Sequence, residues 1–355
     1  MTEYEWDVAL AGPVFLDYGF AELDSSPHNG TEVFADVVGI SPGGIANLAV
    51  ASARLGLRTS MAAPFGSDAF GDWCWTVLCD QEGIDLSSSR RIVGMPTPMT
   101  VALSSAGDRS MITYAPGVSA AARSIHAATS ARVIIADLKS LDAAHDSWWR
   151  RAADDGTRIF ADIGWDSSER WLGADLAPLD ACYAFTPNER EAMAYTRAAD
   201  PVGAARALAE RVPLVVVTRG ADGVVAIDSA SGIEVIVPAL SVPVLDPTGA
   251  GDVFTAALVR ASLLGLALHE QAAFAVLASG IAVTRRGSAL SAPGWGDISR
   301  WWRENRDSGD AELRTRYDFL DGVIPPGTHA EVAGAPDALP SSVLRDVERP
   351  VGSHP

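Results

Sequence analysis

The chain has 355 residues, of which 48% are hydrophobic and 20% are charged, as expected for a globular protein with one large domain or two smaller ones. Its 45 acidic and 27 basic residues give a formal net charge of −18, and such a surface repels phosphate backbones and anionic lipids. We therefore expect neither a nucleic acid nor a membrane partner. The acidic N-terminus and the lack of an apolar run of membrane-spanning length predict a cytoplasmic protein.

The cysteines and histidines show no pattern of a metal site. Cys74, Cys79 and Cys182 are an odd number without paired spacing, which argues against a disulfide framework and against zinc. The six histidines form no ligand pair at helical spacing. We expect the three thiols to be buried apolar residues.

The first third of the chain mixes helical and strand patterns. Hydrophobic periodicity and turn residues predict, in chain order, a buried strand over 8–11, a half-exposed strand over 32–38, a helix over 44–54, a core strand over 59–63, and a hairpin of strands 100–104 and 110–114.

From about residue 120 the pattern changes to short apolar strands separated by alanine-rich helical stretches. The strands are expected over 133–136, 159–161, 183–185 and 214–217. This alternation predicts a parallel sheet covered by helices. Ligands of such sheets bind beyond the carboxyl ends of the strands, where Asp162, Thr186 and Thr218 fall.

The segment 246–252 is the most informative part of the chain, because it predicts a strand end, a glycine turn and the start of a helix. The backbone N–H groups of Gly249, Ala250 and Gly251, together with the helix dipole, make an anion site. Asp252 adds a carboxylate at the same place. The local pattern leaves two roles open for it: a helix cap, or the base of a phosphoryl transfer to a hydroxyl group.

Two common kinds of phosphate site do not fit this segment. A P-loop ends in Gly-Lys-Ser/Thr, and the single lysine, Lys139, follows no glycine loop. A dinucleotide fingerprint needs a third glycine three residues after the second, and that position is Phe254.

Five motifs in order, from about Val8 to about Pro293, resemble the PfkB/ribokinase family of carbohydrate kinases. Segment 246–252 is similar to the C-terminal signature of the family. The other four are Gly12 with Asp17, Gly43-Gly44 with Asn47 and the later segment 65–71, Asn188 with Glu191, and the loop 218–223.

The resemblance implies an α/β fold, namely a ribokinase-like three-layer sandwich with a mostly parallel central sheet and a small β lid. The kinase domain is expected over 1–305, with lid strands near 31–40 and 98–115. Lids of this family often form a dimer contact, which predicts a homodimer. The proline-broken segment 306–355 is expected to be a loosely ordered tail, with a short helix near 342–347.

The resemblance also implies ATP-dependent, Mg²⁺-requiring phosphorylation of a primary hydroxyl of a sugar or sugar-like alcohol. Asp252 would be the base, and the N–H groups of Gly249, Ala250 and Gly251 would hold the developing charge. The substrate would contact four residues: Asp17, Gly43, Gly44 and Asn47. The nucleotide would contact five: Asn188, Thr218, Gly220, Gly223 and Gly251.

The resemblance further implies two cation sites. Asn188 and Glu191 would hold Mg²⁺, mostly through water, although their spacing at a helix start also fits a simple cap. Asp246 and the loop 286–288 would bind a monovalent cation such as K⁺. For Asp17 the alternative is an ordinary surface turn.

Two departures from the family pattern leave the substrate open. The glycine motif at 43–47 is one residue shorter than usual, and Phe15 stands where ribose-type relatives carry asparagine. A phenyl ring cannot form a hydrogen bond with a substrate hydroxyl, but it can pack on a nucleobase or on a deoxy carbon. The alternatives are therefore a nucleoside kinase on the same fold, or a non-catalytic sugar or nucleotide sensor, which we would expect to have lost Asp252, Asn188 or Glu191.

Overall fold

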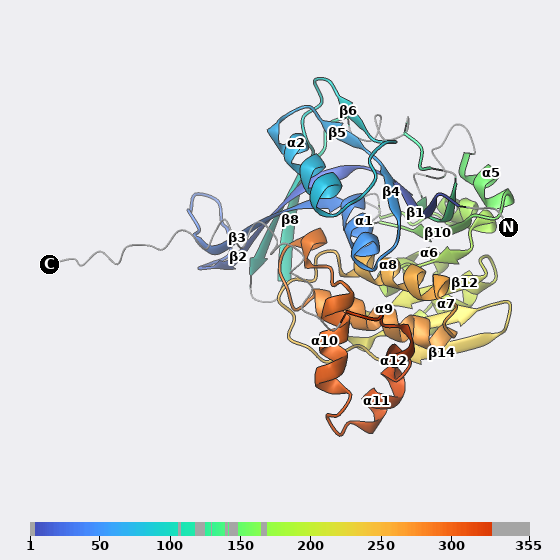
Figure 1. Ribbon diagram of the computed structural model, residues 1–355. Helices are drawn as coiled ribbons and strands as arrows, with labels where there is room; N and C mark the ends of the chain where they lie inside the picture. Colours follow the sequence, from blue (N-terminus) through green and yellow to red (C-terminus); the bar gives the residue numbers. More distant parts are fainter. Residues whose placement is uncertain are drawn as a thin grey trace.

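The computed structural model describes residues 4–105, 108–117, 125–128, 130–138, 141, 148–164 and 169–328. An eight-stranded main sheet has the order β14-β13-β12-β11-β10-β9-β1-β4 (Figure 1). Its strands are β1 (Trp6–Ala11), β4 (Thr59–Ala62), β9 (Ala131–Asp137), β10 (Arg158–Asp162), β11 (Ala184–Phe185), β12 (Leu214–Thr218), β13 (Val224–Asp228) and β14 (Ile233–Val237).

The six strands from β4 to β12 in this sheet are parallel, as predicted. β13 and β14 form an antiparallel hairpin at one edge, which the sequence analysis did not predict. Because the parallel strands all point the same way, their carboxyl ends meet at one edge of the sheet. Asp162 and Thr218 are the last residues of β10 and β12 at that edge.

Helices cover the two faces of the main sheet. Their bounds are α1 (Ile45–Arg54), α2 (Ala69–Thr76), α5 (Trp148–Asp154), α6 (Glu189–Thr196), α7 (Pro201–Ala209), α8 (Ala250–Leu263), α9 (Leu268–Ala282), α10 (Trp295–Asn305), α11 (Ala311–Tyr317) and α12 (Leu320–Val323). A π-helix spans Val77–Gln81, and 3-10 helices span Gly173–Ala181, Gly220–Asp222 and Ser288–Ser291.

Strand β9 shows how the layers are divided. Val133 and Ile135 pack into one apolar cluster with α1, α8, α9 and α10, whereas Ile134 and Ala136 pack into a second cluster with α5, α6 and α7. A strand buried on both faces needs a continuous apolar sequence, which this one has. The three-layer α/β arrangement predicted from the sequence is confirmed.

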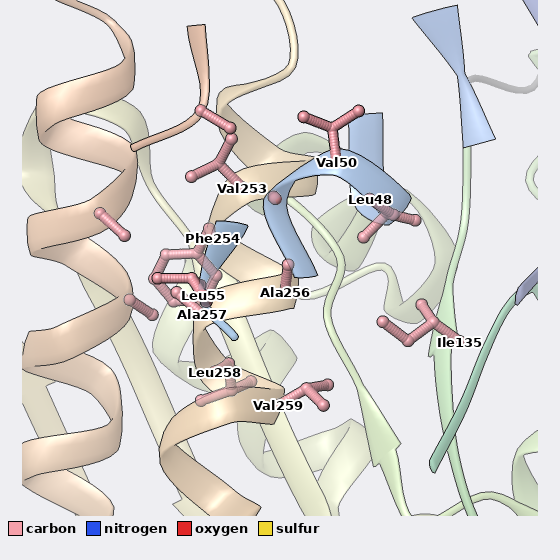
Figure 2. Packing of buried hydrophobic residues seen from close by; sticks show 14 of the residues in the cluster. Leu48, Val50, Leu55, Ile135, Val253, Phe254, Ala256, Ala257, Leu258 and Val259 are labelled. Carbon is pink, nitrogen blue, oxygen red and sulfur yellow. The ribbon is translucent and has the colours of Figure 1, made fainter. Parts of the chain in front are cut away.

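The apolar interface between α8 and α1 fixes the helix that follows the glycine turn. Val253, Phe254 and Ala257 of α8 belong to the same buried cluster as Leu48 and Val50 of α1 (Figure 2), and the two helices contact each other. The small alanines let the two helices approach closely, and close packing leaves little freedom for the position of either helix. The start of α8 is therefore rigidly placed against the start of α1.

A separate four-stranded sheet, order β3-β2-β7-β8, lies to one side of the main sheet (left in Figure 1). It consists of β2 (Val14–Leu23), β3 (Ala35–Gly44), β7 (Met99–Ser105) and β8 (Asp108–Tyr114), and we call it the lid sheet. The hairpin of β7 and β8 was predicted, and the strand expected near 31–40 lies four residues later. A further short parallel pair joins β5 (Pro64–Gly66) to β6 (Arg90–Ile92).

The segment with Asp17 differs from the expectation. The alternative of a surface turn at Asp17 is wrong, because Asp17 lies inside strand β2, opposite Ser41 of β3 and Thr100 of β7. Asp17 is flanked on both sides by paired strands, so its carboxylate is held by the sheet and not by a loop.

The chain stays packed beyond residue 305, which corrects the predicted start of the tail. Tyr317 at the end of α11 and Leu320 at the start of α12 are fully buried against the core. The indole N–H of Trp302 in α10 donates to Asp321 in α12 at 2.7 Å. The helix predicted near 342–347 lies outside the described residues.

Two further expectations concern the whole chain. Cys74, Cys79 and Cys182 are free thiols; Cys74 and Cys182 are buried, as expected, whereas Cys79 is only half-buried, which corrects the expectation for that residue. Within the ranges that the structure describes, no helix is both long and apolar enough to span a bilayer.

Candidate active site

A cavity of about 480 Å³ lies between the lid sheet and the start of α8. The predicted substrate residues Asp17, Gly44 and Asn47 line it together with Gly249 and Asp252 of the glycine turn. These residues come from three separate parts of the chain, around positions 17, 44–47 and 249–252. The structure thus brings the expected sugar-contact residues and the expected base to one place.

A chain of hydrogen bonds joins the polar side chains of this cavity. The Asn47 Nδ2 amide donates to Asp252 Oδ2 at 2.9 Å. The Ser288 hydroxyl lies 3.0 Å from Asp17 Oδ2 and 3.0 Å from Asn47 Oδ1. Asp17, Ser288, Asn47 and Asp252 therefore form one connected network.

Gly43 and Gly44 shape the floor of the cavity. A Cβ atom on Gly43 would lie 2.0 Å from Asp17 Oδ2, so only glycine lets this carboxylate lie directly on the β3 backbone. Gly44 has a φ of 64° and begins α1 as its N-cap. Its own Cβ would lie 2.5 Å from the Pro13 carbonyl oxygen and 2.7 Å from the Phe15 ring. The two glycines thus make room for Asp17 and Phe15, which both line the cavity.

The anion site at the start of α8 is present in part. Gly249 is the N-cap in the left-handed region, with a φ of 78°, and Asp252 lies in the first turn of the helix. The N–H of Ala250 donates to the Pro247 carbonyl at 3.2 Å, so this donor is engaged within the turn. At Gly251 an added Cβ would meet open space, which leaves the backbone accessible to a ligand.

The pKa values of Asp252 and Asp17 are both raised. The pKa of Asp252 is raised to about 6, chiefly by burial; the Asn47 hydrogen bond opposes this shift, and the negative charge of Asp17 contributes to it. Burial also raises the pKa of Asp17 to about 6, with Asp246 adding to the shift and the Ser288 hydroxyl opposing it. A base with a pKa near the working pH is suited to proton transfer.

Asp162 is a third acidic residue of the site, noted in the sequence only for its position at a strand end. Burial raises its pKa well above the usual range, and the charges of Asp252 and Glu191 contribute to the same shift. Its Oδ1 accepts the backbone N–H of Ile163 at 2.8 Å. The carboxyl of Asp162 thus lies within electrostatic reach of both Asp252 and Glu191.

Asn188 and Glu191 form a reciprocal capping box at the start of α6. The Glu191 N–H donates to Asn188 Oδ1, and the Asn188 N–H donates to Glu191 Oε2, both at 2.9 Å. The capping interpretation of this motif is therefore confirmed. The backbone of Asn188 also bridges to Thr218 at the end of β12, which brings the two predicted nucleotide residues side by side.

The donor atoms suit a magnesium ion that arrives with a nucleotide. Among the residues that the structure describes, no group of three His, Cys, Asp or Glu side chains could hold a metal ion by itself. Mg²⁺ keeps several waters and is usually bound by one or two carboxylates together with substrate phosphates. The side-chain oxygens of Asp162 and Glu191 would offer ligands of this kind, and a cation beside them would favour the ionised form of Asp162.

The two glycines of the predicted nucleotide loop differ in environment. Gly220 opens the 3-10 helix Gly220–Asp222 with a φ of 53°, and an added Cβ would meet open space. Gly223 has a φ of 84°, and its Cβ would lie 2.0 Å from the Val237 carbonyl oxygen of β14. The close approach of β14 is thus sufficient to explain why a glycine is required at position 223, without any contact to a nucleotide.

Asp246 joins two loops at the rim of the cavity. Its Oδ1 accepts the Thr248 N–H at 2.9 Å, and its Oδ2 lies 3.5 Å from the Gly287 N–H donor. The glycine turn and the loop 286–288, which the sequence analysis paired, are therefore neighbours.

A family model identifies the family to which this chain belongs, and one curated relative matches part of the chain. The model of the pfkB family carbohydrate kinase matches residues 22–295. The bifunctional protein HldE of Pelobacter propionicus is 33% identical over 128 residues, which cover 34% of this chain and 26% of that protein. This chain thus spans about a quarter of the length of that curated relative.

Solved structures agree on the fold. The Arabidopsis thaliana ribokinase complexed with ribose and ATP has a TM-score of 0.68 at 22% identity, with 83% of this chain and 98% of that chain covered. An E. coli structural neighbour in complex with ATP and Mg²⁺ has a TM-score of 0.70 at 21% identity, with 84% and 99% covered. The predicted ribokinase-like fold is confirmed. Because the family model matches well over half of its length, the chain belongs to the pfkB family of carbohydrate kinases.

Proposed function

We propose that this protein transfers the γ-phosphoryl group of ATP to a primary hydroxyl of a sugar or sugar-like alcohol. One observation carries the proposal: the Asp252 carboxylate, at the N-terminus of α8, shares a cavity with Asp17 and Asn47. A base, an anion-binding helix start and a polyol-binding carboxylate are the groups that this reaction requires.

Each group has a distinct part in the reaction. Asp17 accepts hydrogen bonds from substrate hydroxyls, while the Asn47 amide holds Asp252 in place. The acceptor oxygen attacks the γ-phosphorus, the bond from that phosphorus to the β–γ bridging oxygen breaks, and Asp252 takes the hydroxyl proton. The start of α8, with Gly249 and Gly251, stabilises the charge that develops on the phosphoryl oxygens.

The nucleotide side lies toward β12 and α6. We assign contact with ATP to Asn188, Thr218 and Gly220, which lie together at the carboxyl end of the main sheet. Mg²⁺, when bound, would supply positive charge that offsets the negative charge of the phosphates. Glu191 and Asp162 would hold it, largely through water. We further propose that a K⁺ ion binds beside Asp246. The Asp246 carboxylate contacts both loops at the rim of the cavity, which supports this site.

A nucleoside kinase is the second candidate, and one feature favours it. Phe15, Tyr18, Phe20 and Met111 line the cavity from the lid sheet, so much of the wall facing the substrate is aromatic or aliphatic. Such a wall can pack on a flat base better than on a hydroxylated sugar ring. A non-catalytic sensor is disfavoured, because Asp252, Asn188 and Glu191 are all retained.

We also propose a homodimer formed through the lid sheet and a cytoplasmic location. Strand β8 is at the edge of the lid sheet and exposes Met111, Ile112 and Tyr114. An edge strand with exposed apolar side chains favours pairing with another chain. Size-exclusion chromatography with light scattering, on the parent and on Ile112→Lys, tests the dimer.

The experiment for the activity is ATP consumption against a panel of sugars, sugar alcohols and nucleosides, with Mg²⁺ present and with K⁺ present or absent. Turnover with a sugar supports the first candidate, and turnover confined to nucleosides supports the second. No turnover with any acceptor, by a protein that binds ATP, would contradict both.

A further inference from the structure

Ser288 is the residue of the cavity whose conformation the sequence does not explain. It begins the 3-10 helix Ser288–Ser291 after Gly287, it is buried, and its φ is 47°. A non-glycine residue in the left-handed region costs free energy, on the order of 1–3 kcal/mol, and such positions cluster at functional sites. Its side chain points into the hydrogen-bond network and not into the core.

The hydroxyl of Ser288 faces more acceptors than it can serve. It has one proton, while Asp17 Oδ2 and Asn47 Oδ1 both lie 3.0 Å from Ser288 Oγ. When Asp17 is ionised, this proton can point fully toward only one of the two oxygens. Ser288 is therefore shared between the carboxylate that meets the substrate and the amide that holds Asp252.

We propose that Ser288 is a positioning residue that couples the binding of substrate at Asp17 to the orientation of Asp252, through Asn47. In the empty cavity the hydroxyl is drawn toward the Asp17 carboxylate. When substrate hydroxyls donate to Asp17, that carboxylate no longer needs Ser288, and the hydroxyl turns to Asn47 Oδ1. The Asn47 side chain is then fixed at both ends, and its Nδ2 group holds one oxygen of Asp252 in place. This role rests on the proposed kinase activity.

The test compares two variants that lack the hydroxyl but differ in backbone strain. Ser288→Ala keeps the strain of a positive φ, whereas Ser288→Gly relieves it. We expect both variants to lose roughly ten- to hundredfold in kcat, with the KM for ATP within threefold of the parent, a loss of the size expected when the buried Asn47 Oδ1 acceptor is left without its donor. Ser288→Gly should melt at or above the temperature of the parent. A kcat within threefold of the parent in Ser288→Gly, or losses of kcat that follow the melting temperatures, would overturn the proposal.

Ser52→Ala is the matched control. Ser52 lies in α1 with Asn47 and is fully buried, and its hydroxyl has no hydrogen-bond partner among the described residues. Its replacement removes a buried serine hydroxyl of the same kind outside the network, so its kcat should equal that of the parent.

A double variant with Asn47→Ala tests whether the loss of kcat in Ser288→Ala depends on Asn47. If Ser288 acts through Asn47, the double variant Ser288→Ala/Asn47→Ala should be no slower than Asn47→Ala alone. Additive losses would show that Ser288 acts by another route.

A titration separates this proposal from the kinase activity itself. The Ser288 hydroxyl favours the ionised form of Asp17, which also faces Asp246, Asp252 and Thr100. In NMR titrations of carboxyl carbons without ATP, Ser288→Ala should raise the pKa of Asp17. An unchanged pKa of Asp17 contradicts the contact between them, whereas a parent without turnover on any acceptor contradicts only the proposed activity.

Discussion

At the scale of single residues, the candidate site concentrates negative charge that folding must bury. Asp252 has a pKa of about 6, chiefly through burial, and the ordinary value is 3.8. The folded chain therefore binds a proton between about pH 4 and pH 6 that the unfolded chain has released. The stabilisation that this proton gives to the folded chain is fully present below the pKa of Asp252 in the unfolded chain. It is lost as the pH rises through the pKa of Asp252 in the folded chain.

This burial predicts that Asp252→Asn stabilises the protein at high pH. Asparagine removes the charge and can still accept from Asn47. The free energy of unfolding should rise by roughly 1–3 kcal/mol near pH 8, and this gain should vanish below about pH 4. Urea denaturation of parent and variant at several pH values measures it. A gain that is equal at all pH values would contradict burial of the charge as the cause.

Phe15 is the residue with the clearest bearing on specificity. Its ring lies against Gly44 and lines the cavity. If it contacts the substrate, Phe15→Asn should shift the ratio of kcat/KM toward more hydroxylated acceptors by roughly ten- to hundredfold, since an unpaired buried polar group costs about 1–3 kcal/mol. Kinetics on paired acceptors and the melting temperature check this. An unchanged ratio with a lower melting temperature would assign Phe15 to packing alone.

At the scale of helices and strands, α6 allows the charge of Glu191 to be separated from its capping role. Glutamine keeps the reciprocal cap that Glu191 makes with Asn188. We therefore expect Glu191→Gln to retain the melting temperature of the parent and to require several times more Mg²⁺ for half-maximal turnover. Magnesium titration at fixed sugar and ATP measures this. An unchanged magnesium dependence would leave capping as the only role of Glu191.

The C-terminal helices give a prediction about stability alone. Leu320 is fully buried in the core cluster that also contains Tyr317 and Trp302. Leu320→Ala should lower the free energy of unfolding by about 2–5 kcal/mol and leave the KM for both substrates unchanged, because α12 does not line the cavity. Asp318→Ala, at an exposed position between α11 and α12, serves as the control for denaturation experiments. A loss below about 1 kcal/mol in Leu320→Ala would contradict its burial.

The sequence predicts those elements whose patterns are local. The apolar runs at 133–136 and 214–217 identify parallel strands because both faces are buried. Strand β2 was missed because Asp17 and Gly19 interrupt its apolar pattern, and it is stabilised by its partners β3 and β7. The hairpin of β13 and β14 had a readable signal, since two apolar runs flank the turn at 229–232.

The network of the site was less predictable than its individual members. Family motifs identify Asp17, Asn47 and Asp252 separately. The contact between Ser288 and Asp17 joins residues 271 positions apart, and it depends on how α9 ends and on the approach of the lid sheet. No local pattern specifies such a contact, so the role of Ser288 could be inferred only from the folded chain.

At the scale of the whole molecule, the net negative charge of the protein does not attract phosphates. Any phosphate would have to be bound by groups in its immediate surroundings. A net charge of −18 disfavours phosphates in general, so the proposed phosphate site would depend on the start of α8 and on a metal ion to offset this repulsion. The carboxyl of Asp162 also interacts electrostatically with Asp252 and Glu191, so negative charge is concentrated near the start of α8. This concentration of negative charge is the physical reason to expect that turnover requires magnesium.

The most direct test of the central claim is the turnover of Asp252→Asn with the best acceptor of the panel, measured together with ATP binding by calorimetry. If Asp252 is the base, the variant should bind MgATP within about threefold of the parent while kcat falls by ~10² to 10⁴. A variant that binds MgATP normally and turns over within threefold of the parent would contradict the assignment of Asp252 as the catalytic base.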